Sequence, residues 1–267
     1  MKLTKWLPKA LEKFVRERMT IYVYNYGFRP SAVVREQIFK FKIASGEMTV
    51  KADYRTALYD MIAEVIDYDA YQLQQLQFDS NSEHHILDIG ANVGVSAIVF
   101  SQIPRATITC YEPDPGNCAF LRQNLKLNGI TNVKVFQAAV ATVNGTTEFQ
   151  IDEESTGGHV VRGSVKGKSQ KIKVSVTTLE RAIDDCGSDV IDLLKCDCEG
   201  GEYDIVEQIT PKLAKRIRNI TVEVHDLDQS HNLQSISSHL SRLGYQLSHK
   251  PDMWERSALH LLLATRA

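Results

Sequence analysis

The sequence lacks several features that would assign it to a specialised class of protein. No window holds the roughly 18 apolar residues that a membrane-spanning helix needs. Residues 1–20 mix Lys, Glu and Arg with their apolar positions and so lack the apolar core of a secretory signal. The net charge is only −2, which gives no general attraction to nucleic acid, so we expect no nucleic-acid partner.

Cysteine is scarce and irregularly placed. The five cysteines are an odd number without the spacing of a disulfide framework, which predicts a reduced, cytoplasmic protein. Cys196 and Cys198 are too close together and too isolated to make a zinc site, so we expect them to pack as small apolar side chains.

Residues 1–84 carry the pattern of an accessory segment. Leu3, Leu7 and Leu11 share a helical stripe, and residues 1–18 hold six Lys or Arg against two Glu. A basic amphipathic helix can lie on an anionic membrane surface, but more often it caps a domain. We therefore expect a mainly helical cap or lid over residues 1–84, and contact with a membrane surface stays open.

From residue 85 to 267 strands and helices alternate, which predicts an α/β fold with helices on both faces of a mostly parallel sheet. Two strands at the C-terminal end suit a hairpin, so the last strand of the sheet should be reversed. Residues 142–177 interrupt the alternation and predict an inserted β-hairpin. The expected sheet strands are 86–89, 107–111, 133–140, 191–198, 220–225, 245–249 and 258–264.

The run Ile86–Gly94 passes from an apolar strand through a glycine turn into a helix, and this pattern is typical of a loop that binds a nucleotide cofactor. Gly90 and Gly94 would let the backbone, with Ala91 and Asn92 between them, approach a ligand closely. Asp88 at the end of the strand would repel a dinucleotide pyrophosphate and attract the ammonium group of a methionine moiety. The loop therefore favours S-adenosylmethionine over NAD.

Glu112 ends the second strand, 22 residues after Gly90. An acidic residue at about 20 positions after the glycine loop is where the ribose of a nucleotide is held. Pro113 stiffens the chain that follows. We expect the adenine to lie against the backbone at Ala139, near the end of the third strand.

Charged residues gather where two later strands end. Lys195, Asp197 and Glu199 share one face of a strand that is otherwise apolar, and ligands bind at this end of such sheets. A structural pair between the lysine and a carboxylate is the alternative interpretation. Methyl transfer to a hydroxyl needs a base, and His225 on the neighbouring strand is the first candidate, followed by Asp197 and Glu199.

A metal-assisted reaction stays open at the same edge of the sheet. Asp197 together with Glu223 and Asp226 could hold a divalent cation, although the spacing is not diagnostic. We therefore keep these three residues as weak candidates for metal ligands, and we do not favour a metal-dependent reaction.

Six ordered motifs carry a resemblance to a known family. They are Asp88–Gly94, Tyr111–Pro115, Leu121–Gly129, Val176–Leu179, Ile191–Glu202 and Val222–His225. Over residues 54–264 the chain resembles the FkbM-type S-adenosylmethionine-dependent methyltransferases. The resemblance implies a class I, Rossmann-like fold with a doubly wound seven-stranded sheet, and commonly O-methylation of sugars or natural-product hydroxyls.

The resemblance also implies cofactor roles for Asp88, Gly90, Asn92 and Glu112, and functional roles for Asp197 and Glu199. We expect an enzyme that methylates a hydroxyl of a sugar, glycan or small metabolite. An NAD-dependent oxidoreductase and an N-methyltransferase are the weaker alternatives. Asp88 counts against the oxidoreductase, and the run after Asp197 has neither the proline nor the aromatic residue that holds a planar amine.

Overall fold

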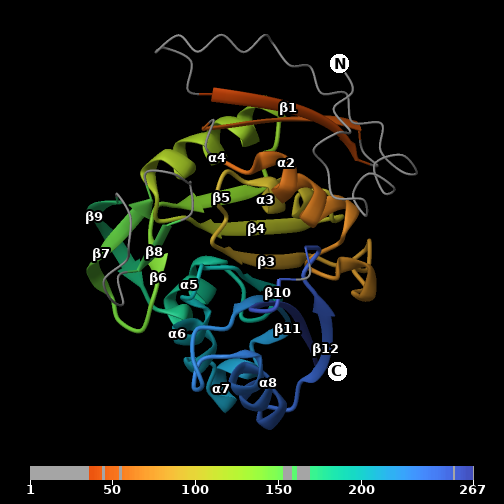
Figure 1. Cartoon of the computed structure of the whole chain (residues 1–267). Coiled ribbons are helices and arrows are strands. Elements are labelled where there is room, and N and C mark those ends of the chain that lie inside the picture. Colours follow the sequence, from red (N-terminus) through yellow and green to blue (C-terminus); the bar gives the residue numbers. More distant parts are fainter. Residues whose placement is uncertain are drawn as a thin grey trace.

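The computed structural model describes residues 36–43, 46–53, 56–152, 158–160, 169–254 and 256–266. Its centre is a seven-stranded sheet in the order β12-β13-β11-β10-β3-β4-β5 (Figure 1). All pairs from β5 to β11 are parallel, and β13 runs antiparallel to both of its neighbours. The predicted doubly wound sheet with a reversed last strand is therefore confirmed. The strands are β3 (His84–Ile89), β4 (Ala106–Tyr111), β5 (Val133–Phe136), β10 (Ile191–Cys196), β11 (Ile217–His225), β12 (Gln246–Pro251) and β13 (Leu259–Thr265).

Helices cover both faces of this sheet, and apolar clusters fill the space on each side. All six residues of β10 are buried, because the strand lies at the centre between two helical layers. The helices are α3 (Val95–Phe100), α4 (Pro115–Leu127), α5 (Leu179–Asp185), α6 (Glu202–Glu207), α7 (Pro211–Ala214) and α8 (Leu233–Arg242). Asp114 caps α4 by accepting hydrogen bonds from the N–H groups of Gly116 and Asn117, as its sequence predicts.

The insertion forms a second sheet in the order β6-β9-β7-β8. Its centre is the predicted hairpin, made of β7 (Gly145–Asp152) and β9 (Ser169–Thr177), and the short strand β8 (Gly158–Val160) pairs with β7. The prediction of one strand over residues 133–140 is wrong. β5 ends at Phe136, and β6 (Ala139–Val140) pairs with β9 of the second sheet. The apolar pattern suits either sheet, so only tertiary pairing decides where the strand changes partner.

The described part of the N-terminal segment begins with a β-hairpin of β1 (Glu36–Ile43) and β2 (Gly46–Asp53). The expected mainly helical cap is therefore wrong for residues 36–43 and 46–53, where apolar and polar residues alternate with the period of a strand. Helical turns follow at α2 (Leu58–Ile62), the π-helix η2 (Ala63–Asp67) and the short 3₁₀-helix η3 (Leu73–Gln75). The basic stripe of residues 1–18 lies outside the described residues. Within the described ranges, no helix is long and apolar enough to cross a membrane.

The hairpin lies on the outer side of α4 (Figure 1). Two asparagines of α4 hold it there. Asn124 accepts from the N–H of Lys51 and donates to its carbonyl oxygen, both at 2.8 Å, and Asn128 does the same at Thr49. The Nδ2 group of Asn124 also donates to the carbonyl oxygen of Val93 at 2.8 Å. One buried side chain thus connects the hairpin to the glycine loop.

Candidate active site

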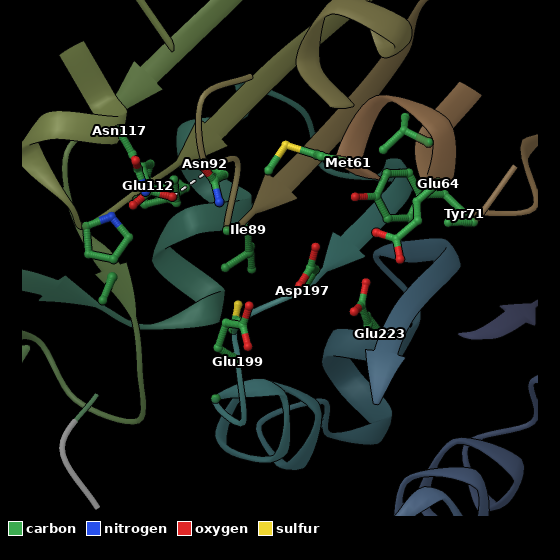
Figure 2. Close-up of a pocket in the computed structure, with 18 of the residues that line it drawn as sticks. Met61, Glu64, Tyr71, Ile89, Asn92, Glu112, Asn117, Asp197, Glu199 and Glu223 are labelled. Carbon is green, nitrogen blue, oxygen red and sulfur yellow. Dashed lines mark hydrogen bonds between the residues drawn. The ribbon is translucent and has the colours of Figure 1, made fainter. Parts of the chain in front are cut away.

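A cavity of about 580 Å³ opens at the carboxyl ends of the central strands. Its lining comes from the loops after β3, β4 and β10, from Glu223 within β11, and from residues 138–140 and Phe149 at the second sheet. The turns at residues 57–71 and the β12–β13 connection complete it. Figure 2 shows Glu112 and Asn117 at one end, and Glu64 and Tyr71 at the other, with Asp197 between them. The lining residues of these two ends differ in chemistry.

The glycine turn follows β3, as predicted, but its glycines serve the packing of the loop. Gly90 has a φ of +79°, and a Cβ there would lie 1.8 Å from the carbonyl oxygen of Asp197. Gly94 has a φ of +93°, and a Cβ there would lie 2.3 Å from Cδ1 of Leu121. Gly90 and Asn92 line the cavity, whereas Ala91 is buried and does not. Close contact with neighbouring elements therefore explains both glycines without a ligand.

Asp88 does not line the cavity, so its predicted direct contact with the cofactor is not supported. Its carboxylate is fully buried, 3.2 Å from Nζ of Lys195, and accepts from the Ser96 hydroxyl at 2.6 Å. Nζ of Lys195 also donates to the Gly90 carbonyl oxygen at 2.6 Å and lies 3.5 Å from the carboxylate of Asp197. Lys195 and Asp88 thus form the structural pair that sequence analysis kept as an alternative, and Lys195 does not line the cavity.

Burial opposes the charge on Lys195, but Asp88, Tyr71 and Asp197 outweigh it and raise the pKa of the ammonium group. The lysine therefore stays protonated and cannot act as a base. Its role is to hold the turn at Gly90 against β10.

Glu112 lies where the sequence predicts it, at the cavity wall and almost fully buried. Its Oε2 accepts from the N–H of Asn92 and its Oε1 from the N–H of Asp114, both at 2.8 Å. Burial raises the pKa of Glu112 to about 7, while these two N–H groups act to lower it. Each carboxylate oxygen keeps a lone pair for a further donor.

The surface beside Glu112 combines flat, weakly polar groups. Pro113 and Ala139 line the cavity as expected, and Asn117 and Phe149 join them. Sequence analysis missed both of these residues. Asn117 lies on the first turn of α4, shortly after Glu112 and after Asp114, the N-cap of the helix. The sequence could therefore have predicted its place beside Glu112. Phe149 comes from the inserted sheet and has no local signal.

The other end of the cavity is rich in carboxylates. The predicted residues Asp197 and Glu199 are there, with Glu223 from β11 (Figure 2). Sequence analysis missed Glu64 and Tyr71, which the helical turns before β3 bring to the same space. Burial raises the pKa of Glu223 well above its ordinary value, and Asp197 adds to this, while His225 opposes it. Burial likewise raises the pKa of Glu199.

The structure does not favour His225, which sequence analysis placed first, as the general base. It does not line the cavity, and Nδ1 lies 3.0 Å from the carboxylate of Glu202. Nε2 lies 3.5 Å from Glu199 and 3.8 Å from Glu223. Burial acts to lower its pKa, but Glu202 first, and then Glu199 and Asp197, raise it to about 10. The imidazole is therefore already protonated near neutral pH and cannot accept a proton.

The three candidate metal ligands are not brought together. Asp226 does not line the cavity, because its carboxylate accepts from the N–H of Leu233 at 2.7 Å and lies 3.2 Å from Nε2 of His260. Across the part of the chain that the structure describes, no group of three or more His, Cys, Asp or Glu residues could hold a metal ion.

The fold agrees with what comparison with known proteins finds. The methyltransferase domain of METTL16 matches 76% of this chain and 68% of that chain, with a TM-score of 0.50 and 13% sequence identity. This likeness shows the class I, Rossmann-like methyltransferase fold alone.

Two curated relatives are methyltransferases. The 2-O-methyltransferase NoeI of Sinorhizobium fredii is 30% identical over 140 residues, or 45% of this chain and 55% of that protein. The chain thus spans about half the length of this relative. The methyltransferase sdnD of Sordaria araneosa is 25% identical over 216 residues, or 69% of this chain and 82% of that protein.

A family model described as the methyltransferase FkbM domain matches residues 88–247, from the glycine loop to β12. This range is more than half of the chain and contains all six motifs that carried the resemblance. The chain therefore belongs to the FkbM family of methyltransferases.

Proposed function

We propose that the protein transfers a methyl group from S-adenosylmethionine to a hydroxyl of a sugar, glycan or natural-product metabolite. The observation that carries this proposal is one cavity with a ribose-type carboxylate, Glu112, at one end and several carboxylates at the other. The name of the relative NoeI, a 2-O-methyltransferase, supports oxygen as the methyl acceptor.

The residues at the Glu112 end fit the adenosine part of the cofactor. The two oxygens of Glu112 already accept one backbone N–H each, so both can still accept from a ribose hydroxyl. Pro113, Asn117 and Ala139 offer flat surface and one amide for the adenine. Carboxylates of Asp197 and Glu199 suit the positive charges of the methionine part. S-adenosylmethionine supplies a methyl group on a sulfonium, which leaves as a neutral thioether.

The chain itself must bind the acceptor and remove its proton. Because the leaving thioether is neutral, no acid is needed, but a hydroxyl becomes a good nucleophile only as it loses its proton. His225 cannot take that proton, since it is already protonated. The base must therefore be one of the carboxylates at the acidic end of the cavity, where Asp197 and Glu199 are the candidates that sequence analysis proposed.

Calorimetric titration of the full chain with S-adenosylmethionine, and separately with NAD, tests the proposal. We expect S-adenosylmethionine to bind and NAD to give no heat of binding. Glu112→Ala should weaken S-adenosylmethionine roughly 10-fold to 100-fold, because hydrogen bonds to a charged group contribute about 1.5–3 kcal/mol.

The matched control is Glu83→Ala, which removes an exposed glutamate whose partner is Arg105, outside the cavity. This variant should bind S-adenosylmethionine like the unmodified chain. Binding of NAD without any response to S-adenosylmethionine would overturn the proposal.

A further inference from the structure

The cavity has two ends that come from different parts of the chain. The end at Glu112 is lined by residues within 88–247, the range that the family model matches. The opposite end is lined largely from outside that range, by residues of the turns at 57–71 and by Trp254 and Arg256 of the β12–β13 connection. This end of the cavity is therefore formed mainly by segments that flank the family domain.

Glu64 and Asp60 are the two carboxylates that these flanking segments place in the cavity, and Glu64 is the one paired with Arg256. It stands on the π-helix η2, where the N–H of Tyr68 reaches back five residues to the carbonyl oxygen of Ala63 at 2.9 Å. Short π-helical turns often occur at functional sites, because they change the direction of a side chain at a cost in helix stability. Figure 2 shows the carboxylates of Glu64, Asp197 and Glu223 directed toward the same space.

Oε1 of Glu64 is held in place by a charged partner. Nη2 of Arg256 lies 2.9 Å from Oε1 of Glu64. Arg256 is itself fixed by Asp252, which accepts from Nε at 3.0 Å and from Nη2 at 2.8 Å. No partner is recorded for Oε2 of Glu64 among the described residues. A side chain oriented at one oxygen and open to the cavity at the other has the geometry of a general base with its orienting partner.

We propose that Glu64 is the general base of the reaction and that Arg256 is its positioning residue. This inference rests on the proposed methyl transfer. The acceptor hydroxyl donates its proton to Oε2 of Glu64. The acceptor oxygen forms its bond to the methyl carbon, and the electron pair of the broken C–S bond stays on sulfur. Charge balances, because the carboxylate becomes a neutral acid and the sulfonium becomes a thioether.

The electrostatic surroundings of Glu64 agree with this role. Burial raises the pKa of Glu64 to about 7, Arg256 opposes the rise, and Asp197, Asp252 and Asp60 add to it. Glu223 also faces Glu64 across the cavity. A base whose pKa lies near the working pH combines a useful deprotonated fraction with a strong affinity for the proton.

Labelled-methyl transfer to a panel of neutral methyl glycosides tests the role in the reaction. Glu64→Gln should lower kcat by about 100-fold or more, the usual contribution of a general base, while the Kd for S-adenosylmethionine stays unchanged. In the unmodified chain, kcat/KM should decrease as the pH is lowered through a midpoint near 7, which gives the pH profile an acidic limb. This acidic limb should be absent in Glu64→Gln. Arg256→Gln should shift the limb to higher pH, because Arg256 acts to lower the pKa of Glu64.

Asp67→Asn is the matched control. Asp67 is a carboxylate of the same π-helix that does not line the cavity, so this variant should keep both turnover and the acidic limb. Unchanged turnover and an unchanged acidic limb in Glu64→Gln would overturn the inference. If the unmodified chain fails to bind S-adenosylmethionine, the proposed function fails instead.

Thermal stability gives a test that needs no acceptor. A carboxylate whose pKa is raised on folding destabilises the fold at pH 8, so Glu64→Gln should raise the Tm at that pH. A purely structural ion pair with Arg256 would give the opposite sign, because its loss would lower the Tm. A lowered Tm at pH 8 would therefore overturn the inference even if no glycoside in the panel is methylated.

Discussion

One buried ammonium group holds the glycine loop to the strand beside it. Nζ of Lys195 lies within 3.5 Å of the Asp88 and Asp197 carboxylates and donates to the carbonyl oxygen of Gly90. The side chain is 2% exposed and that of Asp88 is fully buried, so water cannot replace either partner. The pair therefore matters most when one member is removed, because a buried charge is then left unpaired.

Lys195→Met should destabilise the protein by about 3–5 kcal/mol, the usual cost of breaking a buried ion pair. Urea unfolding followed by circular dichroism measures this loss. Much of this loss comes from the Asp88 carboxylate, which stays buried without its partner. The double variant Asp88→Asn with Lys195→Met should therefore regain part of the free energy of unfolding.

Lys212→Met is the control for this prediction. Lys212 pairs with Glu180 at 3.3 Å, but its side chain is 84% exposed, so its loss should cost about 0–1 kcal/mol. Equal, small losses in the two lysine variants would contradict a stabilising role for the buried lysine.

His225 shows what sequence can and cannot say about a single residue. A histidine at the end of a central strand has the ordinary pKa of a general base, so the sequence favours that role. The three carboxylates around it come from Glu199, Glu202 and Glu223, and only the fold brings them together. A pKa depends on all charges within a few ångströms, and most of these are distant in sequence or lie on another element.

At the scale of elements, α4 connects the N-terminal hairpin to the glycine loop. Asn124 and Asn128 are one helical turn apart, so both amides face the exposed edge of β2. Toward β2, each amide accepts from one backbone N–H and donates to one carbonyl oxygen, as a neighbouring strand would do. The side chains thus satisfy an edge that would otherwise be open to unwanted pairing.

Asn124→Leu should detach β2 from α4, because it leaves the N–H and carbonyl of Lys51 and the carbonyl of Val93 without their partner. Each buried polar group left unpaired costs about 1–3 kcal/mol, and the side chain of Asn124 is fully buried. Hydrogen exchange should show faster exchange at the amides of Thr49 and Lys51. Gln123→Leu, at an exposed position of the same helix, should exchange like the unmodified chain. Unchanged protection in Asn124→Leu would contradict the proposed anchoring.

The helices that could be predicted best are those with local signals at their ends. Asp114 and Pro115 define the start of α4, and Thr178 defines the start of α5, because a cap acts within three residues of chain. The change of sheet after Phe136 and the hairpin at residues 36–53 were missed. In both cases strand pairing decides the structure, and a pairing partner is not encoded locally.

At the scale of the whole molecule, the sequence predicts the Glu112 end of the cavity better than the Glu64 end. Gly90 and Glu112 are recognisable because each stands at a fixed place after its strand. Glu64 and Arg256 are separated by 191 intervening residues and meet only in the fold, at 2.9 Å. Residues that come from both flanks of the family domain form no motif of fixed spacing, so the sequence alone does not predict that they share a site.

The carboxylates of the cavity also affect the stability of the entire fold. Burial raises the pKa of Glu64 and of Glu112 to about 7, from an ordinary value of 4.5. The folded state therefore keeps protons that the unfolded state releases, and stability falls as the pH rises from 4.5 to 7. His225 acts in the same direction at higher pH. Its pKa rises from 6.5 to about 10, so the stability that it contributes is complete below pH 6.5 and is lost as the pH approaches 10.

These groups together predict that the Tm is highest near pH 5 and falls steadily toward pH 9. The lowered pKa of Asp228, about 2, adds stability that is complete above its ordinary pKa of 3.8 and is therefore constant over this pH range. The lowered pKa of His249 opposes the trend in part between pH 5 and 7. Differential scanning fluorimetry in buffers of equal ionic strength measures the trend. Glu64→Gln should flatten the part between pH 5 and 7, and His225→Gln should flatten the part above pH 7, since each variant removes the group that titrates there. A Tm that rises from pH 5 to pH 8 would show that the carboxylates of the cavity are stabilised by folding, which would contradict the raised pKa values on which the acidic end of the site depends.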